Sequence, residues 1–69
     1  MELSARNQLP ATVKSVAVGG IMAEVVVELE GGGELVAAIT RASAEKLGLE
    51  TGQRVVAVIK ATEVLVGRP

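Results

Sequence analysis

The stretch MAEVVVELEGGGELVAAIT, residues 22–40, sets the fold of this 69-residue chain. Aliphatic residues alternate with glutamates from Met22 to Glu30, interrupted only by Val26 on the acidic face. A period of two with one apolar face is the pattern of a half-buried β-strand. The triplet Gly31-Gly32-Gly33 then supplies a turn in which a positive φ costs little, and residues 35–40 form another apolar run. The stretch therefore predicts an antiparallel hairpin.

One helix and further short strands are expected on either side of this hairpin. Thr40 is suited to cap a helix over residues 41–47, and Gly48 is suited to end it. Three more apolar runs are typical of strands: residues 12–18, 55–59 and 64–66. Five strands with a helix between the third and the fourth is the order of an OB-fold. We therefore predict an all-β fold, an OB-fold-like five-stranded small barrel, forming one domain over residues 1–69.

The composition indicates that this domain is stabilised by self-association. A chain this short buries a small fraction of its surface, and small domains compensate with disulfides, a structural metal or oligomerisation. The sequence has no Cys and no His, which excludes disulfides and the usual zinc ligands. Apolar residues nevertheless make up 49% of it. This excess fits either a dense aliphatic core or a surface that belongs partly to an interface, and we favour the interface.

Charge and aromatic content narrow the class of ligand. The formal net charge is −1 and there is no Phe, Tyr or Trp, whereas single-stranded nucleic-acid binders use basic grooves and aromatic stacking platforms. Pockets for flat organic ligands are also lined partly by aromatic rings. The amino terminus lacks a signal-peptide pattern, and no apolar run approaches the length of a membrane span. We expect a cytoplasmic protein that binds neither nucleic acid nor membrane and suits a small, strongly charged ligand.

Catalysis is not expected from these residues. The chain offers no Cys or His as nucleophile or near-neutral base. Its carboxylates lie mostly at alternating positions that read as solvated strand faces, and its serines have no evident activating partner. We predict that the protein is not an enzyme.

The sequence is better suited to anion binding than to catalysis. Ser4, Arg6 and Asn7 place a hydroxyl, a guanidinium and an amide together, and the fork of a guanidinium suits two oxygens of a tetrahedral anion. Thr40 and Ser43 add hydroxyls at the start of the expected helix. Each feature also has an ordinary interpretation, namely a solvated tail for the first group and helix capping for the second.

Two further features could also bind an anion. Lys60 follows the apolar run at residues 55–59, where it could neutralise a dianion or simply extend its ammonium group to water. Gly19-Gly20 could present a cluster of backbone donors, or serve only as a flexible connection.

Several separated motifs, in order along the chain, resemble the molbindin family of stand-alone molybdenum-binding Mop domains, which are related to TOBE domains. They are SARNQL at residues 4–9, AAIT at 37–40 with Ser43, LGL at 47–49 with Gly52, and AVIKA at 57–61. The resemblance covers almost the whole chain and implies an OB-like barrel. It also implies a homohexamer, a trimer of dimers, that binds molybdate or tungstate at subunit interfaces with no organic cofactor. Such proteins serve in molybdate storage and homeostasis.

The resemblance also assigns residues to two classes of oxyanion site, neither with direct ligands for a metal cation. The interface site matches these positions: Ser4, Arg6, Asn7, Thr40, Ser43, Lys60 and Ala61. The second site, at the meeting of several subunits, matches the turn of Gly19, Gly20 and Ile21. One departure is the pair Pro10-Ala11, where relatives commonly have a residue followed by glycine.

Two other functions remain open at the level of sequence. An OB-type nucleic-acid-binding module fits the expected fold, although the charge and the missing aromatic residues argue against it. A purely structural oligomerisation domain would use the same polar residues only to cap and to solvate.

Overall fold

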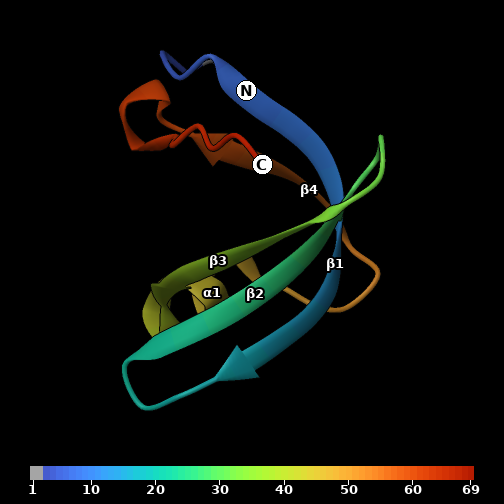
Figure 1. Cartoon of the computed structure of the whole chain (residues 1–69). Coiled ribbons are helices and arrows are strands. Elements are labelled where there is room, and N and C mark those ends of the chain that lie inside the picture. Colours follow the sequence, from blue (N-terminus) through green and yellow to red (C-terminus); the bar gives the residue numbers. More distant parts are fainter. Residues whose placement is uncertain (1–2) are drawn as a thin grey trace.

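Four antiparallel strands form a single, strongly twisted sheet (Figure 1). The computed structural model describes residues 3–69, so the first two residues of the predicted domain 1–69 lie outside the described part. The sheet has the order β3-β2-β1-β4. Its elements are β1 (Asn7–Val18), β2 (Met22–Leu29), β3 (Glu34–Thr40), α1 (Arg41–Leu47), β4 (Arg54–Ile59) and the short 3₁₀ turn η1 (Ala61–Glu63). The all-β class and the helix between the third and fourth strands are confirmed.

The predicted hairpin is present as β2 and β3. Their register runs from Met22 opposite Thr40 to Glu28 opposite Glu34. In the turn, the Leu29 amide donates to the Gly33 carbonyl at 2.9 Å. Gly32 and Gly33 have φ of 102° and 90°, a region that side chains disfavour. Gly32 and Gly33 are therefore the two positions at which the turn favours glycine.

Strand β1 is longer than the predicted residues 12–18, because it begins at Asn7. Its first half pairs with β4 and its second half with β2. Pro10 fits inside this strand because its carbonyl accepts from the Glu30 amide at 3.1 Å, so its missing N–H faces the end of β2 and not the β4 ladder. A bulge between Val13 and Ser15 changes the face on which the apolar residues lie, which explains their imperfect alternation.

Helix α1 forms where its capping signals predict. The Thr40 hydroxyl accepts from the Ser43 amide at 3.1 Å, and Gly48 ends the helix in the left-handed conformation at φ 61°. Only Ala44 of the helix is buried. Within residues 3–69, no helix is both long and apolar enough to cross a membrane.

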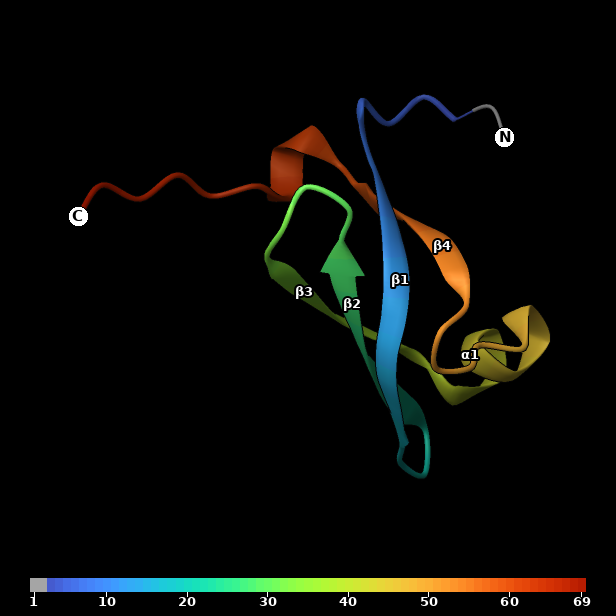
Figure 2. The ribbon, with the colours of Figure 1, turned by 90° about the vertical axis from the view of Figure 1, so that its right-hand side faces the viewer.

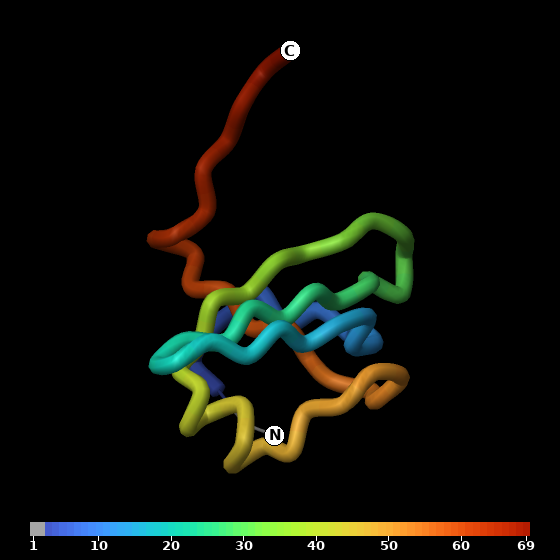
Figure 3. Tube along the Cα trace, turned by 90° about the horizontal axis from the view of Figure 1, so that it is seen from below, coloured from blue at the N-terminus to red at the C-terminus, as the bar shows by residue number. Residues whose placement is uncertain are grey.

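The predicted fifth strand is not confirmed among the described residues. Residues 64–66 pair with no strand among the described residues, and the chain after η1 runs away from the sheet (Figures 2 and 3). The side chains of Leu65 and Val66 are 95% exposed. A strand needs a neighbouring edge for its backbone groups, and this segment does not turn back to β3 or β4. The described chain is therefore a barrel-like sheet of four strands with two free edges.

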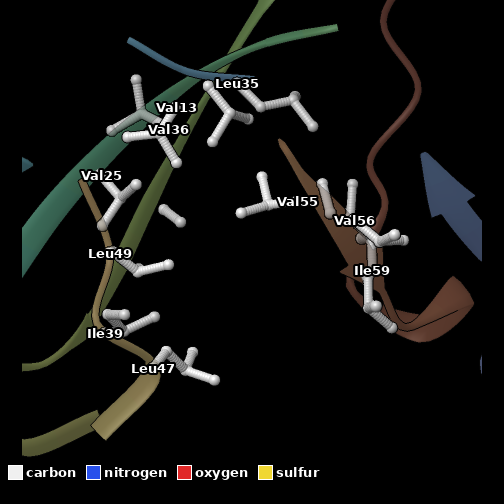
Figure 4. Close-up of a pocket in the computed structure, with 14 residues that line it drawn as sticks. Val13, Val25, Leu35, Val36, Ile39, Leu47, Leu49, Val55, Val56 and Ile59 are labelled. Atoms are coloured by element: carbon white, nitrogen blue, oxygen red, sulfur yellow. The ribbon is translucent and has the colours of Figure 1, made fainter. Parts of the chain in front are cut away.

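The core is small and lies beside an open apolar groove. Ala11, Val13, Val25 and Val27 are buried where β1 and β2 pair. The groove has a volume of about 420 Å³ and a lining that is aliphatic throughout. Figure 4 shows β4 side chains on one side of it and those of β3, α1 and Leu49 on the other, with space between. This groove is apolar surface that the single chain leaves uncovered.

Candidate functional site

The start of β1 and the end of β4 bring the first set of predicted residues together. Asn7 and Ile59 form the last pair of the β1–β4 register, and Arg6 and Lys60 are the residues just beyond this pair. The amino-terminal segment and η1 accordingly share one end of the molecule (Figures 1 and 2). We call this set the Lys60 end group; it comprises Ser4, Arg6, Asn7, Lys60 and Ala61.

The Lys60 end group holds two cations that form no ion pair with the residues the structure describes. The ion pairs among residues 3–69 join Lys14, Arg41 and Arg54 to glutamates, and none includes Arg6 or Lys60. Both side chains are exposed. The nearest carboxylate in sequence is Glu63, within η1. Two cations with hydroxyl and amide groups beside them form a donor set suited to an oxyanion.

Thr40, Ser43 and the glycine turn lie at the opposite end of the sheet. Thr40 pairs with Met22, and the Arg41 amide donates to the Ile21 carbonyl at 2.7 Å. We call this set the Thr40 end group; it comprises Gly19, Gly20, Ile21, Thr40 and Ser43. The register therefore joins both hydroxyls to the turn predicted as a second site.

The hydroxyls of the Thr40 end group already bind one another. The Thr40 hydroxyl donates to the Ser43 hydroxyl at 2.7 Å while accepting from the Ser43 amide. Capping, the ordinary interpretation of these residues, is thus present in the chain, but the Ser43 hydroxyl hydrogen is left to donate elsewhere.

Part of the hydrogen-bonding capacity of the glycine turn is also committed. The Gly19 amide donates to the Met22 carbonyl at 2.8 Å, which leaves Gly20 and Ile21 as the candidate backbone donors. A Cβ on Gly19 would come within 3.0 Å of the Met22 carbonyl oxygen, so the turn closes tightly there. The Arg41 guanidinium lies 3.5 Å from the Gly19 carbonyl and forms an ion pair with Glu45 at 2.8 Å.

One chain does not bring all seven predicted interface residues to one place. The two end groups lie at opposite ends of β1, whose 12 residues have a contour length of about 36 Å at ~3.3 Å per residue and curve within a molecule 34 Å long. The ends of such a strand lie much farther apart than the width of a tetrahedral oxyanion (Figures 1 and 2). An ion that contacts both end groups must therefore contact two copies of the chain.

Sequence reasoning missed two polar contacts beside these groups. Gln8 donates from Nε2 to the Ala5 carbonyl at 2.8 Å, within the segment that carries Ser4 and Arg6. Arg41 lies between α1 and the glycine turn, as described above. The available signals were Gln8, which follows Ser-Ala-Arg-Asn, and Arg41, which follows Thr40, but neither residue reveals its partner until the turns are formed.

The described residues favour an anion over a metal cation. No cluster of three His, Cys, Asp or Glu side chains within residues 3–69 is arranged to hold a metal ion. The end groups instead combine positive charge with hydroxyl and amide donors, which is the chemistry that binds oxyanions.

Comparisons with known proteins give matches over nearly the whole chain. Residues 3–66 match the family model of the TOBE domain. The chain is 44% identical to molybdenum-pterin-binding protein 1 of Clostridium pasteurianum, over 96% of this chain and 97% of the relative. It superposes on a molybdate-binding protein from Sporomusa ovata with a TM-score of 0.91 at 47% identity, covering 99% of this chain and 100% of the other. It also superposes on the cytoplasmic molybdate-binding protein ModG with molybdate bound, at a TM-score of 0.93 and 43% identity, covering 100% of this chain and 49% of that one.

Proposed function

The chain belongs to the TOBE domain family, and from this premise we propose that it binds molybdate at interfaces between copies of itself. The relatives are named for binding molybdenum-pterin or molybdate, and they match over nearly their whole length or, in ModG, about half of it. The donor sets at both ends of β1 suit the same ligand. Molybdate is a tetrahedral dianion, and each of its oxygens accepts hydrogen bonds.

The observation that carries the interface is the separation of the two end groups by β1. Arg6 and Lys60 supply charge at one end, while Thr40 and Ser43 supply hydroxyls at the other. Two chains related by a twofold axis would complete two sites at once, each using one end group from each chain. Cations near the ion offset the cost of taking a dianion out of water.

The apolar groove supports self-association. The groove remains open in the single chain. Leu65 and Val66, a few residues after the proposed site residue Ala61, are also exposed to solvent. Exposed aliphatic surface of this kind marks an interface in a soluble protein. We propose that a second copy covers it, that the OB-like barrel is completed only in the assembly, and that the assembly is a hexamer built as a trimer of dimers.

The ligand we propose is the free oxyanion, molybdate or tungstate, without an organic cofactor. The chain has no aromatic side chain on which a pterin ring could stack. The turn of Gly19, Gly20 and Ile21 is proposed as a second oxyanion site. The role is molybdate storage and homeostasis in the cytoplasm, without catalysis.

Calorimetric titration with molybdate in excess sulfate tests the ligand. Saturable heat with about one anion per chain is expected for the interface sites, because two chains together complete two of them. Assembled protein that gives no heat would leave the structural oligomerisation domain as the function. Binding of single-stranded DNA or RNA at low salt would instead support the nucleic-acid module.

A mixing experiment tests the interface. One defective variant carries Arg6→Gln and Lys60→Met, and the other carries Thr40→Val and Ser43→Ala. When the two are dissociated and reassembled together, mixed pairs contain one doubly defective site and one site with both wild-type end groups. Wild-type affinity should return at about half of the sites in such pairs. Mixtures that bind no better than the separate variants would show that each site lies within one chain.

A further inference from the structure

We propose that Gln8 is a positioning residue for the Lys60 end group, fixing the Ala5–Arg6 peptide so that its N–H and not its carbonyl faces the oxyanion. This inference rests on the proposed function. Gln8 does not contact the ion itself. It acts through the backbone of the segment that carries Ser4 and Arg6.

The contact that carries the inference joins Gln8 Nε2 to the Ala5 carbonyl oxygen at 2.8 Å. Gln8 belongs to β1, where it pairs with Val58, so its backbone is held by the sheet. Ala5 precedes the strand and is held by no sheet register. Both residues are partly buried, which limits competition from water. The side chain of Gln8 thus fastens a segment outside the sheet to the sheet.

Fastening this carbonyl also orients the following amide. Peptide bonds are planar, and the described residues contain no cis peptide. In a trans peptide the C=O and the N–H point in opposite directions, so a carbonyl of Ala5 turned toward Gln8 directs the Arg6 N–H away from it. If this peptide were turned over, carbonyl lone pairs would occupy the place of the donor. Next to a dianion, that exchange replaces attraction with repulsion.

The neighbouring amide, Asn7, is not equivalent to Gln8. Successive residues of a strand point to opposite faces of the sheet, and Asn7 lies opposite Ile59, which shares a face with the core-packed Val55 and Ala57. Asn7 therefore lies on the core face of the sheet and Gln8 on the other. This division leaves Asn7 as a candidate ligand and Gln8 as its support.

The test replaces Gln8 by methionine, which keeps the length of the side chain and removes the donor. Molybdate affinity of Gln8→Met, measured by calorimetry, should fall about fivefold to tenfold, the effect of one net hydrogen bond to a charged site. Gln53→Met is the matched control, because Gln53 bonds the Glu50 amide in the loop before β4, at a distance from both end groups. Gln53→Met should bind as the wild type does. Gln8→Met affinity within twofold of wild type would overturn the inference.

A spectroscopic measurement separates positioning from general stability. The Arg6 amide resonance of the wild-type protein should shift when molybdate saturates the site, and the shift should be smaller in saturated Gln8→Met. If Gln8→Met does not assemble, the wild-type spectrum decides: an Arg6 amide that does not respond to molybdate overturns the inference. Wild-type protein that binds no molybdate would instead reject the proposed function.

Discussion

The two ends of β1 present different kinds of polar group. At the Lys60 end group, Arg6 and Lys60 take part in none of the ion pairs found within residues 3–69. At the Thr40 end group, the hydroxyls are held by a cap and by each other, and the adjacent cation Arg41 is paired with Glu45. One end offers charge that is free to neutralise an anion, and the other offers donors fixed in direction. Substitutions at the two ends should therefore weaken anion binding to different extents.

The largest effect is expected from preventing the two ends of different chains from meeting. The double change Leu65→Asp and Val66→Asp places two charges on side chains that are 95% exposed in the single chain, so the chain itself should still fold. Covering these side chains in an interface would bury unpaired charge. Light scattering should give the monomer mass, and calorimetry should show no molybdate binding. Gly67→Asp, in the same segment, is the control and should assemble normally; monomeric protein that still binds would refute interfacial sites.

Removing charge from the Lys60 end group should come next. Arg6→Gln or Lys60→Met should weaken molybdate binding about 30-fold or more, because a desolvated dianion loses a charged partner. Arg54→Gln is the matched control, since Arg54 is exposed and lies 3.9 Å from Glu30 in a weak ion pair. Equal affinities for Arg6→Gln and Arg54→Gln in calorimetry would remove Arg6 from the site.

A smaller loss is expected at the Thr40 end group. Ser43→Ala deletes a hydroxyl but keeps the backbone amide that Thr40 caps, so the cap of α1 remains. Affinity for molybdate should fall about tenfold, with the thermal midpoint of the anion-free protein unchanged. Ser15→Ala, at an exposed position of β1, provides the comparison. If Ser43→Ala bound molybdate as tightly as Ser15→Ala does, the Thr40 end group would have a capping role only.

The smallest effect concerns the exposed middle of the sheet. The hydrogen bond from Lys14 to Glu34, together with the charges of Glu34 and Glu28, raises the pKa of Lys14. A raised pKa in the folded state means that this pair stabilises the fold below the pKa of a free lysine, about 10.4, and that the contribution disappears as the pH rises through the folded value. Denaturation curves should show wild type losing slightly more stability than Lys14→Met between about pH 9 and about pH 11.5. If wild type and Lys14→Met lost the same stability over this pH range, the ion pair of Lys14 would contribute nothing to the stability of the fold.

Local signals predicted the elements that depend on local chemistry. Helix α1 begins after Thr40 and ends at Gly48, as expected, because both caps form hydrogen bonds with residues only a few positions away. The glycine triplet predicted the β2–β3 turn for the same reason. The start of β1 was missed because Pro10 and the bulge after Val13 obscure its alternation.

Non-local pairing limited the rest. Residues 64–66 have the composition of a strand, but whether they form one depends on an edge that this chain does not bring to them. The proximity of Arg6 to Lys60 follows from the β1–β4 register, which no single segment encodes. The family resemblance assigned Thr40 and Arg6 to one site, but they lie at opposite ends of the sheet in a single chain. They can share a site only if two chains meet, and no segment of the sequence indicates this.

Strand β4 has a consequence for how an anion could leave. Within residues 3–69 this strand is at an edge of the sheet and its ladder is with β1 alone, whereas β1, β2 and β3 form a continuous meander without it. Local opening of β4 would carry Lys60 away from Arg6 while the meander stays folded. Release would then require only a partial opening, and a bound anion would slow amide hydrogen exchange in β4 more than in β2. An edge strand of the sheet would thus set the residence time of the ligand.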